Sequence, residues 1–504
     1  MSSATVARVL VDGLRRMGTP RIFGVPGGGS SLQLMDAARE AGLPFVRTHG
    51  ETPACIMAAV TGELTGVPGA ALTGLGPGAA RAVNGVAHAW LDRSPMIVIT
   101  DRPSSAALAF TTHQRIDQAA LFAPVTKASV TIEPESAAHW IAHAGQLAMT
   151  EPRGPVHLDV AADVAARAAI PVVTSVPPVP LPPPERDALD AAARLLGRAS
   201  RPVIIAGLQC RGHQASKWLR AFAETRPAPV LVTGKAKGVL PDPHPLMLGI
   251  FTGGVIEAAV LGRADLIVAL GLDPVELIPR AWSSTAPVLH LAPSPSTPGY
   301  LRPEVEVVGE IEVILEELAP LLREGERADW DVAELDRLKR DVTRRLAVAT
   351  AGLAPYRAVQ IARELTATGT LATVDSGAHM FPATAFWQAV NPGEFLISNG
   401  LGTMGFALPA AIAAQLVHPD RRVLAFTGDG GLLMAVAELE TAARLALPIV
   451  LVVFDDGALS LDLVALARSF GVAAFVGDSE ETLRRALVLA LAASGPALID
   501  ARIV

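Results

Sequence analysis

The sequence predicts an α/β protein built from three doubly wound domains, each with a mostly parallel sheet. Three observations support this prediction. Short β-rich runs alternate with helix-length segments along the whole chain. The 504 residues are enough for about three domains of ordinary size. Half of the residues are apolar but only 4% are aromatic, so Ala, Val and Leu must fill the cores, which suits closely packed α/β layers.

The first domain is predicted over residues 1–168, and a proline-rich linker follows at 170–184. Strands separated by helix-length segments are typical of βαβ units, which produce parallel sheets. The β-rich runs of this domain stand at 21–25, 69–73, 96–100 and 156–159.

A smaller middle domain is predicted over 187–322 and a third domain over 355–504, with a charged helical connector at 326–340. The β-rich runs of the middle domain stand at 202–206, 229–233, 266–270 and 287–291. Those of the third domain stand at 371–375, 423–427, 449–454 and 497–500. The first and third domains are similar in size and in the alternation of predicted strands and helices, without an obvious residue-level repeat.

Charge and cysteine content exclude several classes of protein. The net charge of −7 argues against a nucleic-acid partner. Cys55 and Cys210 cannot form a disulfide framework or a zinc site, so a reducing compartment is expected. The N-terminal segment resembles an amphipathic helix rather than a signal peptide, and the longest apolar run, 445–454, is too short to cross a bilayer. We therefore expect a cytoplasmic protein with no nucleic-acid or membrane partner.

A glycine-rich turn follows the strand predicted at 423–427. The turn consists of Gly428, Asp429, Gly430 and Gly431. Glycines let the backbone approach a phosphate closely, and the helix predicted after the turn presents free N–H groups to an anion. Asp429 supplies an oxygen ligand suited to Mg²⁺. Asp456 follows 27 residues later, after the next strand, so both acids are expected at the same edge of the sheet.

This pattern resembles the signature of thiamine diphosphate-dependent enzymes, in which a GDG turn is followed at this distance by Asn-Asn. Asp455 and Asp456 stand at the Asn-Asn positions, and a carboxylate there can still bind Mg²⁺. The alternative is a strand-end turn with solvated acids. The resemblance implies metal ligands at Asp429, Asp456 and the carbonyl of Ala458, and diphosphate contacts at Gly428, Gly430 and Gly431.

Glu51 begins an Ala-rich helix after a short strand. Taken alone, it is an ordinary favourable charge in the first turn of a helix. Segments in this part of the chain resemble the pyrimidine-binding domain of the same enzyme family. They cover residues 23–30, 46–51 and 73–100. The resemblance implies that Glu51 is the catalytic glutamate, which activates the cofactor through its aminopyrimidine ring from a dry pocket. Gly28 and Thr73 are implied as further cofactor contacts.

Two segments of the third domain also resemble this family. Residues 399–409 match a loop in which the carbonyl of Gly402 holds the 4′-amino group of the cofactor and Met404 keeps the cofactor bent. A Met in an apolar stretch is also a common core residue. The turn that matches a diphosphate-contacting turn of the family consists of Gly377, Ala378 and His379.

The resemblance covers essentially the whole chain and is closest to the acetolactate synthase branch, with similarity to benzoylformate decarboxylase as well. Gln114 and Lys127 match the acetolactate synthase branch, in which the Gln reaches the cofactor pocket, and both are expected catalytic residues. His113 is similar to active-site histidines of decarboxylases, although a solvated loop position is equally consistent with the sequence. Gly28 stands where pyruvate decarboxylases have a catalytic Asp, which argues against simple acetaldehyde release.

Three further features bear on cofactor and substrate. Residues 271–280 lack the Arg-rich stretch of FAD-binding acetolactate synthases, which argues against FAD. Residues 24–29 do not fit the motif GxGxxG, which argues against a nicotinamide or flavin oxidoreductase. After Asp456 the family has a substantial mobile loop, whereas this sequence passes from 455–461 straight into a predicted helix. We interpret this position as one from which residues are missing.

The resemblance implies a thiamine diphosphate- and Mg²⁺-dependent decarboxylase and carboligase that acts on 2-oxo acids, most simply pyruvate. A carbonyl acceptor then gives acetolactate with release of CO₂. Two alternatives stay open: an enzyme similar to benzoylformate decarboxylase or an aldehyde-lyase that uses a larger 2-oxo acid, and a cofactor-binding but catalytically silent paralogue. The resemblance also implies a homodimer or a homotetramer.

Overall fold

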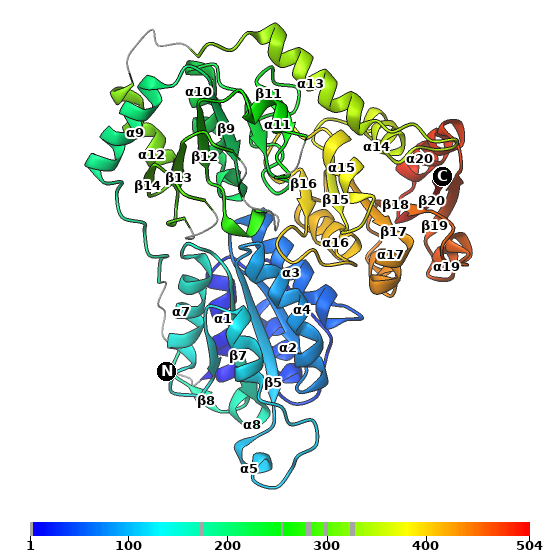
Figure 1. Ribbon diagram of the computed structural model, residues 1–504. Helices are drawn as coiled ribbons and strands as arrows, with labels where there is room; N and C mark the ends of the chain where they lie inside the picture. The colour runs from blue at the N-terminus through cyan, green and yellow to red at the C-terminus, as the bar shows by residue number, and fades with distance from the viewer. Residues whose placement is uncertain are drawn as a thin grey trace.

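The computed structural model describes residues 4–171, 176–253, 256–277, 282, 284–296, 301–322 and 328–503. It confirms the predicted fold class, because the described chain forms three six-stranded parallel sheets with helices packed against them. In Figure 1 the N-terminal domain lies at the bottom, the middle domain at the upper left and the C-terminal domain at the right. Part of the predicted linker, 172–175, lies outside the described residues.

The sheet of the N-terminal domain has the strand order β3-β2-β4-β5-β7-β6. Its strands are β2 (Ile22–Gly24), β3 (Phe45–Arg47), β4 (Gly69–Thr73), β5 (Met96–Arg102), β6 (Ser129–Thr131) and β7 (Pro155–Ala161). Its helices are α1 (Val6–Arg16), α2 (Ser30–Ala41), α3 (Glu51–Thr65), α4 (Pro77–Leu91), α5 (Ser105–Leu108), α6 (Gln118–Phe122), α7 (Ala137–Met149) and α8 (Ala162–Ala165). A short antiparallel pair, β1 (Ala4–Thr5) with β8 (Ala168–Ala169), joins the two ends of the domain.

The middle domain has the strand order β11-β10-β9-β12-β13-β14. Its strands are β9 (Pro202–Ala206), β10 (Val230–Val232), β11 (Met247–Ile250), β12 (Leu266–Leu270), β13 (Val288–Ala292) and β14 (Val305–Val308). Its helices are α9 (Arg186–Arg198), α10 (His213–Thr225), α11 (Ala258–Leu261) and α12 (Ile311–Leu318). The connector helix α13 (Val332–Leu346) begins later than the predicted 326, because Asp331 caps it by accepting from the backbone N–H of Ala333. Residues 326 and 327 lie outside the described part.

The C-terminal domain has the strand order β16-β15-β17-β18-β20-β19. Its strands are β15 (Leu371–Val374), β16 (Phe395–Ile397), β17 (Val423–Gly428), β18 (Ile449–Asp455), β19 (Ala473–Gly477) and β20 (Ala497–Arg502). Its helices are α14 (Pro355–Glu364), α15 (Met380–Phe386), α16 (Ala407–Val417), α17 (Asp429–Ala435), α18 (Glu438–Arg444), α19 (Leu463–Ser469) and α20 (Glu480–Ala492). The N- and C-terminal domains share one strand order, in which the second strand is followed by the first, third, fourth, sixth and fifth.

The N- and C-terminal domains pack against each other through helices. Helix α3 contacts α16, and both belong to one apolar core that also includes strand residues of both domains. The side chains of strand β5 alternate between two apolar cores, one on each face of the sheet. Met96 and Val98 face the shared core, whereas Ile97 and Ile99 face the core that includes α1 and α7. The packing therefore sets the relative position of the two domains within the chain.

The connection after Asp456 is short. The full sequence has no insert here, and α19 begins at Leu463 with Asp462 as its cap. The interpretation that residues are missing is therefore wrong, and Asp456 is left exposed. None of the helices in the described part of the chain has both the length and the apolar character needed for a bilayer crossing.

Candidate active site

The predicted cofactor residues of the C-terminal domain meet at the carboxyl edge of its sheet. The strand order reverses between β15 and β17, and ligands of doubly wound folds bind outside the carboxyl ends of the strands at such a point. Three segments come together here: the turn after β15, the loop before α16, and the turn after β17. Each of them contains residues that the sequence singled out.

His379 lies between the turns after β15 and β17. A Cβ atom built on Gly428 would be 3.3 Å from its Nδ1, and one built on Gly377 would be 2.7 Å from its Cε1, so both glycines leave room for the imidazole. The ring stacks on Phe454 with centroids 5.8 Å apart. Burial lowers the pKa of His379 to about 4, so the ring is neutral at pH 7. The neighbouring Ala378 is exposed.

The loop before α16 lies over these turns. Gly402 and Gly405 have φ angles of +65° and +79°, a region that favours glycine. A Cβ atom on Gly402 would be 3.7 Å from Oγ of Ser376, and Cε of Met404 is 3.8 Å from the Cβ position of Gly430. Met404 is 43% exposed, so it is not a core residue in this chain.

Asp375, which the sequence reading did not select, joins the three segments. Its buried carboxylate accepts from the backbone N–H of Gly405 at 3.0 Å and of Phe406 at 3.2 Å, and from the hydroxyl of Thr427 at 2.9 Å. Burial raises its pKa above the ordinary value. The sequence does show that Asp375 is an acid directly after a buried strand. Its hydrogen-bond partners, however, lie far away in the sequence, so no local pattern indicates its role.

Three carboxylates form a candidate metal centre beside this loop. One oxygen each of Asp429, Asp455 and Asp456 lies within 4.8 Å of the others. Asp455 is an addition to the predicted ligands. The backbone N–H of Ala458 donates to Oδ1 of Asp456 at 2.9 Å, so Ala458 lies beside the acids, and the role of its carbonyl stays a prediction. Close carboxylates of this kind suit a hard cation such as Mg²⁺, which offsets their mutual repulsion.

The N-terminal domain provides a second group of predicted residues. Glu51 is the first residue of α3 and is 7% exposed. Its Oε1 is 3.2 Å from the Cβ position of Gly78, at the start of α4, and its Oε2 is 3.5 Å from Nε of the exposed Arg81. Glu51 is therefore a buried carboxylate at the carboxyl edge of the N-terminal sheet, with one surface-exposed cation nearby.

Gln114 lies beside the same turn. It has a φ of +55°, and its carbonyl oxygen is 2.5 Å from the Cβ position of Gly76, so a side chain at Gly76 would collide with it. Gln118, another residue that the sequence reading did not select, fixes this arrangement. Its side-chain oxygen accepts from the backbone N–H of Gly76 at 2.9 Å, and its side-chain nitrogen donates to Asp159 at 2.8 Å. Gln114 and His113 themselves are exposed.

The remaining predicted residues of this domain are dispersed. Thr73 is buried at the end of β4, and Gly28 is exposed with open space where a Cβ would stand. Lys127 lies at the amino edge of the sheet, opposite to Glu51, where its Nζ donates to the carbonyls of Thr150 at 2.5 Å and Pro152 at 2.9 Å. The structure therefore does not bring Lys127 together with Glu51 and Gln114.

The two groups of residues occupy different places in one chain. Glu51 lies at Gly78 near the start of α4, whereas the loop before α16 contacts His88, whose Nδ1 is 3.0 Å from Oγ of Ser398. Ten residues of helix separate Gly78 from His88, a distance of about 15 Å at the usual rise. Among the described residues, Glu51 makes no hydrogen bond or ion pair with the C-terminal domain. Oε1 of Glu438 in the C-terminal domain does accept from the backbone N–H groups of His49 and Gly50, directly before Glu51. We call the two groups the N-terminal and C-terminal halves of the candidate site.

Both halves contain polar atoms suited to a bound cofactor. Buried atoms without a hydrogen-bond partner in the described part of the chain include Oε2 of Glu51, Oγ of Ser376, Nε2 of His379, Oγ1 of Thr403 and Oδ2 of Asp429. Unpaired buried polar atoms are costly, and four of these lie together around the turns of the C-terminal group, on Ser376, His379, Thr403 and Asp429. A phosphate-bearing cofactor with a divalent cation and a polar ring fits these donors and acceptors.

Three family models match the chain, and together they define its class. They are the thiamine pyrophosphate enzyme N-terminal TPP binding domain over residues 4–121, the central domain over 189–318, and the C-terminal TPP binding domain over 375–501. The chain belongs to the thiamine pyrophosphate enzyme family. The match of the two TPP binding domains agrees with the two half-sites described above.

Individual relatives extend this comparison. The chain is 30% identical to a probable acetolactate synthase large subunit of Methanocaldococcus jannaschii, over 98% of this chain and 91% of that protein. It is 29% identical to an acetolactate synthase of Bacillus subtilis, over 98% and 92%, and 28% identical to the acetolactate synthase isozyme 1 large subunit of Escherichia coli, over 99% and 94%. The first alignment spans 540 positions, more than the 504 residues of this chain, so that relative has segments that this chain lacks.

Proposed function

We propose that this chain is a thiamine diphosphate- and Mg²⁺-dependent decarboxylase and carboligase that converts pyruvate to acetolactate and CO₂. The observation that carries the proposal is the gathering of Asp429, Asp455 and Asp456 beside His379 and Met404, at the point where the strand order reverses. The names of the relatives support acetolactate synthesis.

We match the residues of the candidate site with the parts of the cofactor that they would bind. Asp429 and Asp456, with the carbonyl of Ala458, hold Mg²⁺. When bound, thiamine diphosphate accepts the electron pair that a 2-oxo acid releases as CO₂ leaves. The diphosphate contacts are Gly377, Ala378, His379, Gly428, Gly430 and Gly431. The ring of His379, whose Nε2 has no hydrogen-bond partner in the described chain, would lie against the diphosphate.

The other residues orient the reactive ring and move a proton. Met404 presents its exposed side chain at the site, and the carbonyl of Gly402 accepts from the cofactor's amino group. Glu51 exchanges a proton at Oε2, the carboxylate oxygen that has no hydrogen-bond partner in the described chain. Gln114 stands beside Gly76, next to Glu51, where it can contact the substrate.

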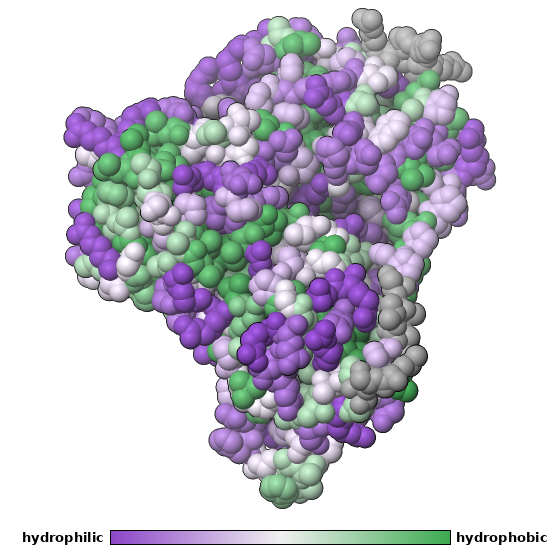
Figure 2. Space-filling view, turned by 180° about the vertical axis from the view of Figure 1, so that it is seen from behind, coloured by the Kyte–Doolittle hydropathy of each residue, from purple (hydrophilic) through white to green (hydrophobic). Residues whose placement is uncertain are grey.

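We place the complete site between two copies of the chain, because Glu51 makes no hydrogen bond or ion pair with the C-terminal half among the described residues of one copy. Exposed apolar side chains surround the C-terminal half; they are Leu401, Met404, Leu433, Met434, Leu459 and Leu461. Figure 2 shows a broad hydrophobic area over the C-terminal domain, at the left of that view. Exposed apolar surface of this kind favours association. A homodimer is therefore the minimal active unit, and a homotetramer is a pair of such dimers.

A second candidate is a related activity on a larger 2-oxo acid, such as benzoylformate. Gly28 has open space around its Cβ position, and the short connection leaves Asp456 exposed. Both features leave room for a bulkier acyl group beside the proposed site.

The experiment measures CO₂ and acetolactate from pyruvate, and CO₂ from benzoylformate, with and without thiamine diphosphate and Mg²⁺. Cofactor-dependent acetolactate supports the first candidate, and turnover of benzoylformate alone supports the second. Cofactor binding without turnover of either would contradict both and indicate a silent paralogue.

The shared site has its own test. Glu51→Gln and Asp429→Ala, each inactive alone, are co-expressed so that mixed dimers form. Because a mixed dimer contains one site with both residues intact, activity should partly return. A mixture as inactive as its parents would contradict the two-copy site.

A further inference from the structure

The middle domain has the strand order of dinucleotide-binding α/β domains. Its first three strands extend in one direction from β9 and its last three in the other direction from β12. The place for a nucleotide is the carboxyl edge between β9 and β12, where phosphates accept hydrogen bonds from backbone N–H groups of the loop after the first strand. FAD-binding acetolactate synthases, which this chain resembles, make a dinucleotide the ligand to consider here.

A side chain of the protein itself occupies this edge. Oε2 of Glu276 accepts from the backbone N–H of Leu208 at 2.8 Å and of Asp273 at 3.2 Å, and its Oε1 accepts from the hydroxyl of Thr233. These donors follow β9, β12 and β10 respectively. A Cβ atom on Gly207 would lie 2.5 Å from Oε2 of Glu276, so the glycine that could admit a phosphate admits this carboxylate instead.

A local role does not account for these contacts. Glu276 is the third residue of a capping box with Asp273, at the short helical turn Pro274–Glu276. The capping box explains the bond to the N–H of Asp273 but not the bonds to Leu208 and Thr233, which belong to other loops. Glu276 is 6% exposed, so its carboxylate is buried among these donors.

Cationic side chains along the same edge are already paired with carboxylates of the N-terminal domain. Lys235 binds Glu63 at 2.7 Å, and Arg211 binds the same carboxylate at 2.8 Å. On the opposite loop, Asp273 pairs with Arg93 of the N-terminal domain at 2.9 Å. The edge that holds nucleotides in related folds is thus a docking face between domains here.

We propose that Glu276 is a built-in hydrogen-bond acceptor that takes the position of a nucleotide phosphate, and that the middle domain of this chain binds no FAD or adenine nucleotide. A phosphate and the carboxyl group of Glu276 compete for the same three donors, and donors that already bond to Glu276 are not free for a phosphate. The inference goes beyond the proposed function and does not depend on it.

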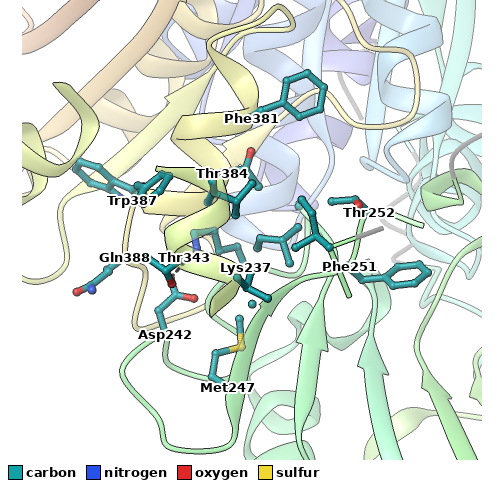
Figure 3. A pocket seen from close by; sticks show the side chains of 18 of the residues that line it. Lys237, Asp242, Met247, Phe251, Thr252, Thr343, Phe381, Thr384, Trp387 and Gln388 are labelled. Atoms are coloured by element: carbon teal, nitrogen blue, oxygen red, sulfur yellow. Dashed lines mark ion pairs between the residues drawn. The ribbon is translucent and has the colours of Figure 1, made fainter. Parts of the chain in front are cut away.

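The neighbouring cavity leads to the same conclusion. A cavity of about 710 Å³ lies between β11 and the following loop on one side and α15 on the other, and both Thr233 and Glu276 are in its wall. Figure 3 shows Phe381, Thr384 and Trp387 on one side of it and Met247 and Phe251 on the other. Where the cavity reaches this strand edge, a phosphate would meet the carboxyl group of Glu276, which already accepts from the donors there. The wall also contains cationic side chains, of which Lys237 pairs with Asp242 at 2.7 Å and Arg357 pairs with Glu480 at 2.7 Å.

The test is a calorimetric titration of the whole protein with FAD, ADP and inorganic phosphate, in the presence of saturating thiamine diphosphate and Mg²⁺ so that the diphosphate site proposed above is occupied. The wild type should bind none of them saturably, and Glu276→Ala should gain saturable binding of ADP, because three donors lose their acceptor. Glu317→Ala, an exposed residue of the same domain, is the matched control and should resemble the wild type.

Saturable binding of FAD or ADP by the wild type, or a yellow purified protein, would overturn the inference. A folded Glu276→Ala variant with unchanged ADP affinity would also overturn it. If Glu276→Ala does not fold, Glu276→Gln keeps an acceptor and the shape of the side chain, and it should exclude both nucleotides as the wild type does. Binding of either nucleotide by the wild type remains decisive in that case.

Discussion

The carboxylate of Asp92 accepts a hydrogen bond from the backbone N–H of Gly400 at 2.7 Å. Asp92 is fully buried at the end of α4, and it also lies 3.0 Å from Nζ of Lys235 in the middle domain. Gly400 begins the segment that leads to Gly402 and Met404. All three domains therefore meet at one carboxylate, directly beside the proposed cofactor loop.

Asp92→Ala should weaken thiamine diphosphate binding by about tenfold, because the backbone N–H groups of Asn399 and Gly400 lose their acceptor and the loop is less well held. The measurement is a titration of tryptophan fluorescence with the cofactor. Asp36→Ala, an exposed residue of α2, is the control and should leave the affinity unchanged. Unchanged cofactor affinity in a folded Asp92→Ala variant would refute the role of this contact.

Stability in acid should depend on Glu63. Burial alone would raise its pKa, but Lys235 and Arg211 outweigh burial and lower the pKa to about 2. A carboxylate with a depressed pKa stabilises the fold above its ordinary value of 4.5 and loses that contribution as the pH falls toward 2. Glu63→Gln should therefore be less stable than the wild type at pH 7, by about 3–5 kcal/mol for a broken buried ion pair.

This difference should shrink as the pH falls from 4.5 toward 2, because the wild-type carboxyl then becomes protonated as well. Urea unfolding at several pH values measures it. A difference between the two proteins that stays constant over this range would show that the ion pair does not set the pKa of Glu63.

Glu438 should position Glu51. From α18 of the C-terminal domain, Oε1 of Glu438 accepts from the backbone N–H of His49 at 2.9 Å and of Gly50 at 3.1 Å, directly before α3. Glu438→Ala should lower kcat about tenfold, because two buried donors lose their acceptor and the start of α3 shifts. Glu438→Gln, which keeps an acceptor, should restore most of the rate.

The control for this variant is Glu440→Ala, which removes the contacts with the imidazole of His49 and with the guanidinium of Arg444 but leaves the backbone contacts of Glu438 in place. Steady-state kinetics with saturating cofactor separates kcat from KM. Equal losses in Glu438→Ala and Glu440→Ala would mean that domain packing, rather than the two backbone contacts, governs the rate.

Lys127 should contribute to stability more than to catalysis. Burial lowers its pKa to about 8, and its ammonium bonds to two backbone carbonyls near the cis bond between Glu151 and Pro152. Lys127→Met should cost about 1–3 kcal/mol of unfolding free energy and keep kcat within a factor of about 3. Calorimetry and kinetics on the same sample measure both, and a large loss of kcat at unchanged stability would favour the catalytic role implied by the family resemblance.

Sequence periodicity predicted the interior strands of all three sheets. Continuous apolar runs such as 266–270 and 449–454 form strands buried on both faces. The strands that were missed are all at sheet edges; they are β1, β6, β8, β11, β14, β16 and β19. Edge strands pair on one side only, and several are less completely covered, as the alternating exposure of β19 shows. Strand β16 is apolar and buried throughout, but its three residues are too few to form a pattern.

The site was predicted where its residues follow one another along the chain, as in the turn from Gly428 to Gly431. Asp375, Gln118 and Glu438 were missed because their partners are distant in sequence: Oε1 of Glu438 binds residues 388 and 389 positions away. No local pattern marks an acid whose role is to hold another segment. Lys127 is a different case. Its place in the sequence matches the acetolactate synthase branch, but its side chain does not lie with Glu51 and Gln114.

The most direct test of the account compares the wild type with Glu51→Gln for CO₂ release from pyruvate, at saturating thiamine diphosphate and Mg²⁺, with cofactor affinity measured on both proteins. Glu51 is proposed to move a proton rather than to hold the diphosphate. We therefore expect the variant to bind the cofactor with an affinity close to that of the wild type and to lose at least about a hundredfold in kcat. A variant that keeps its rate, or a wild type whose turnover does not require the cofactor, would contradict the account.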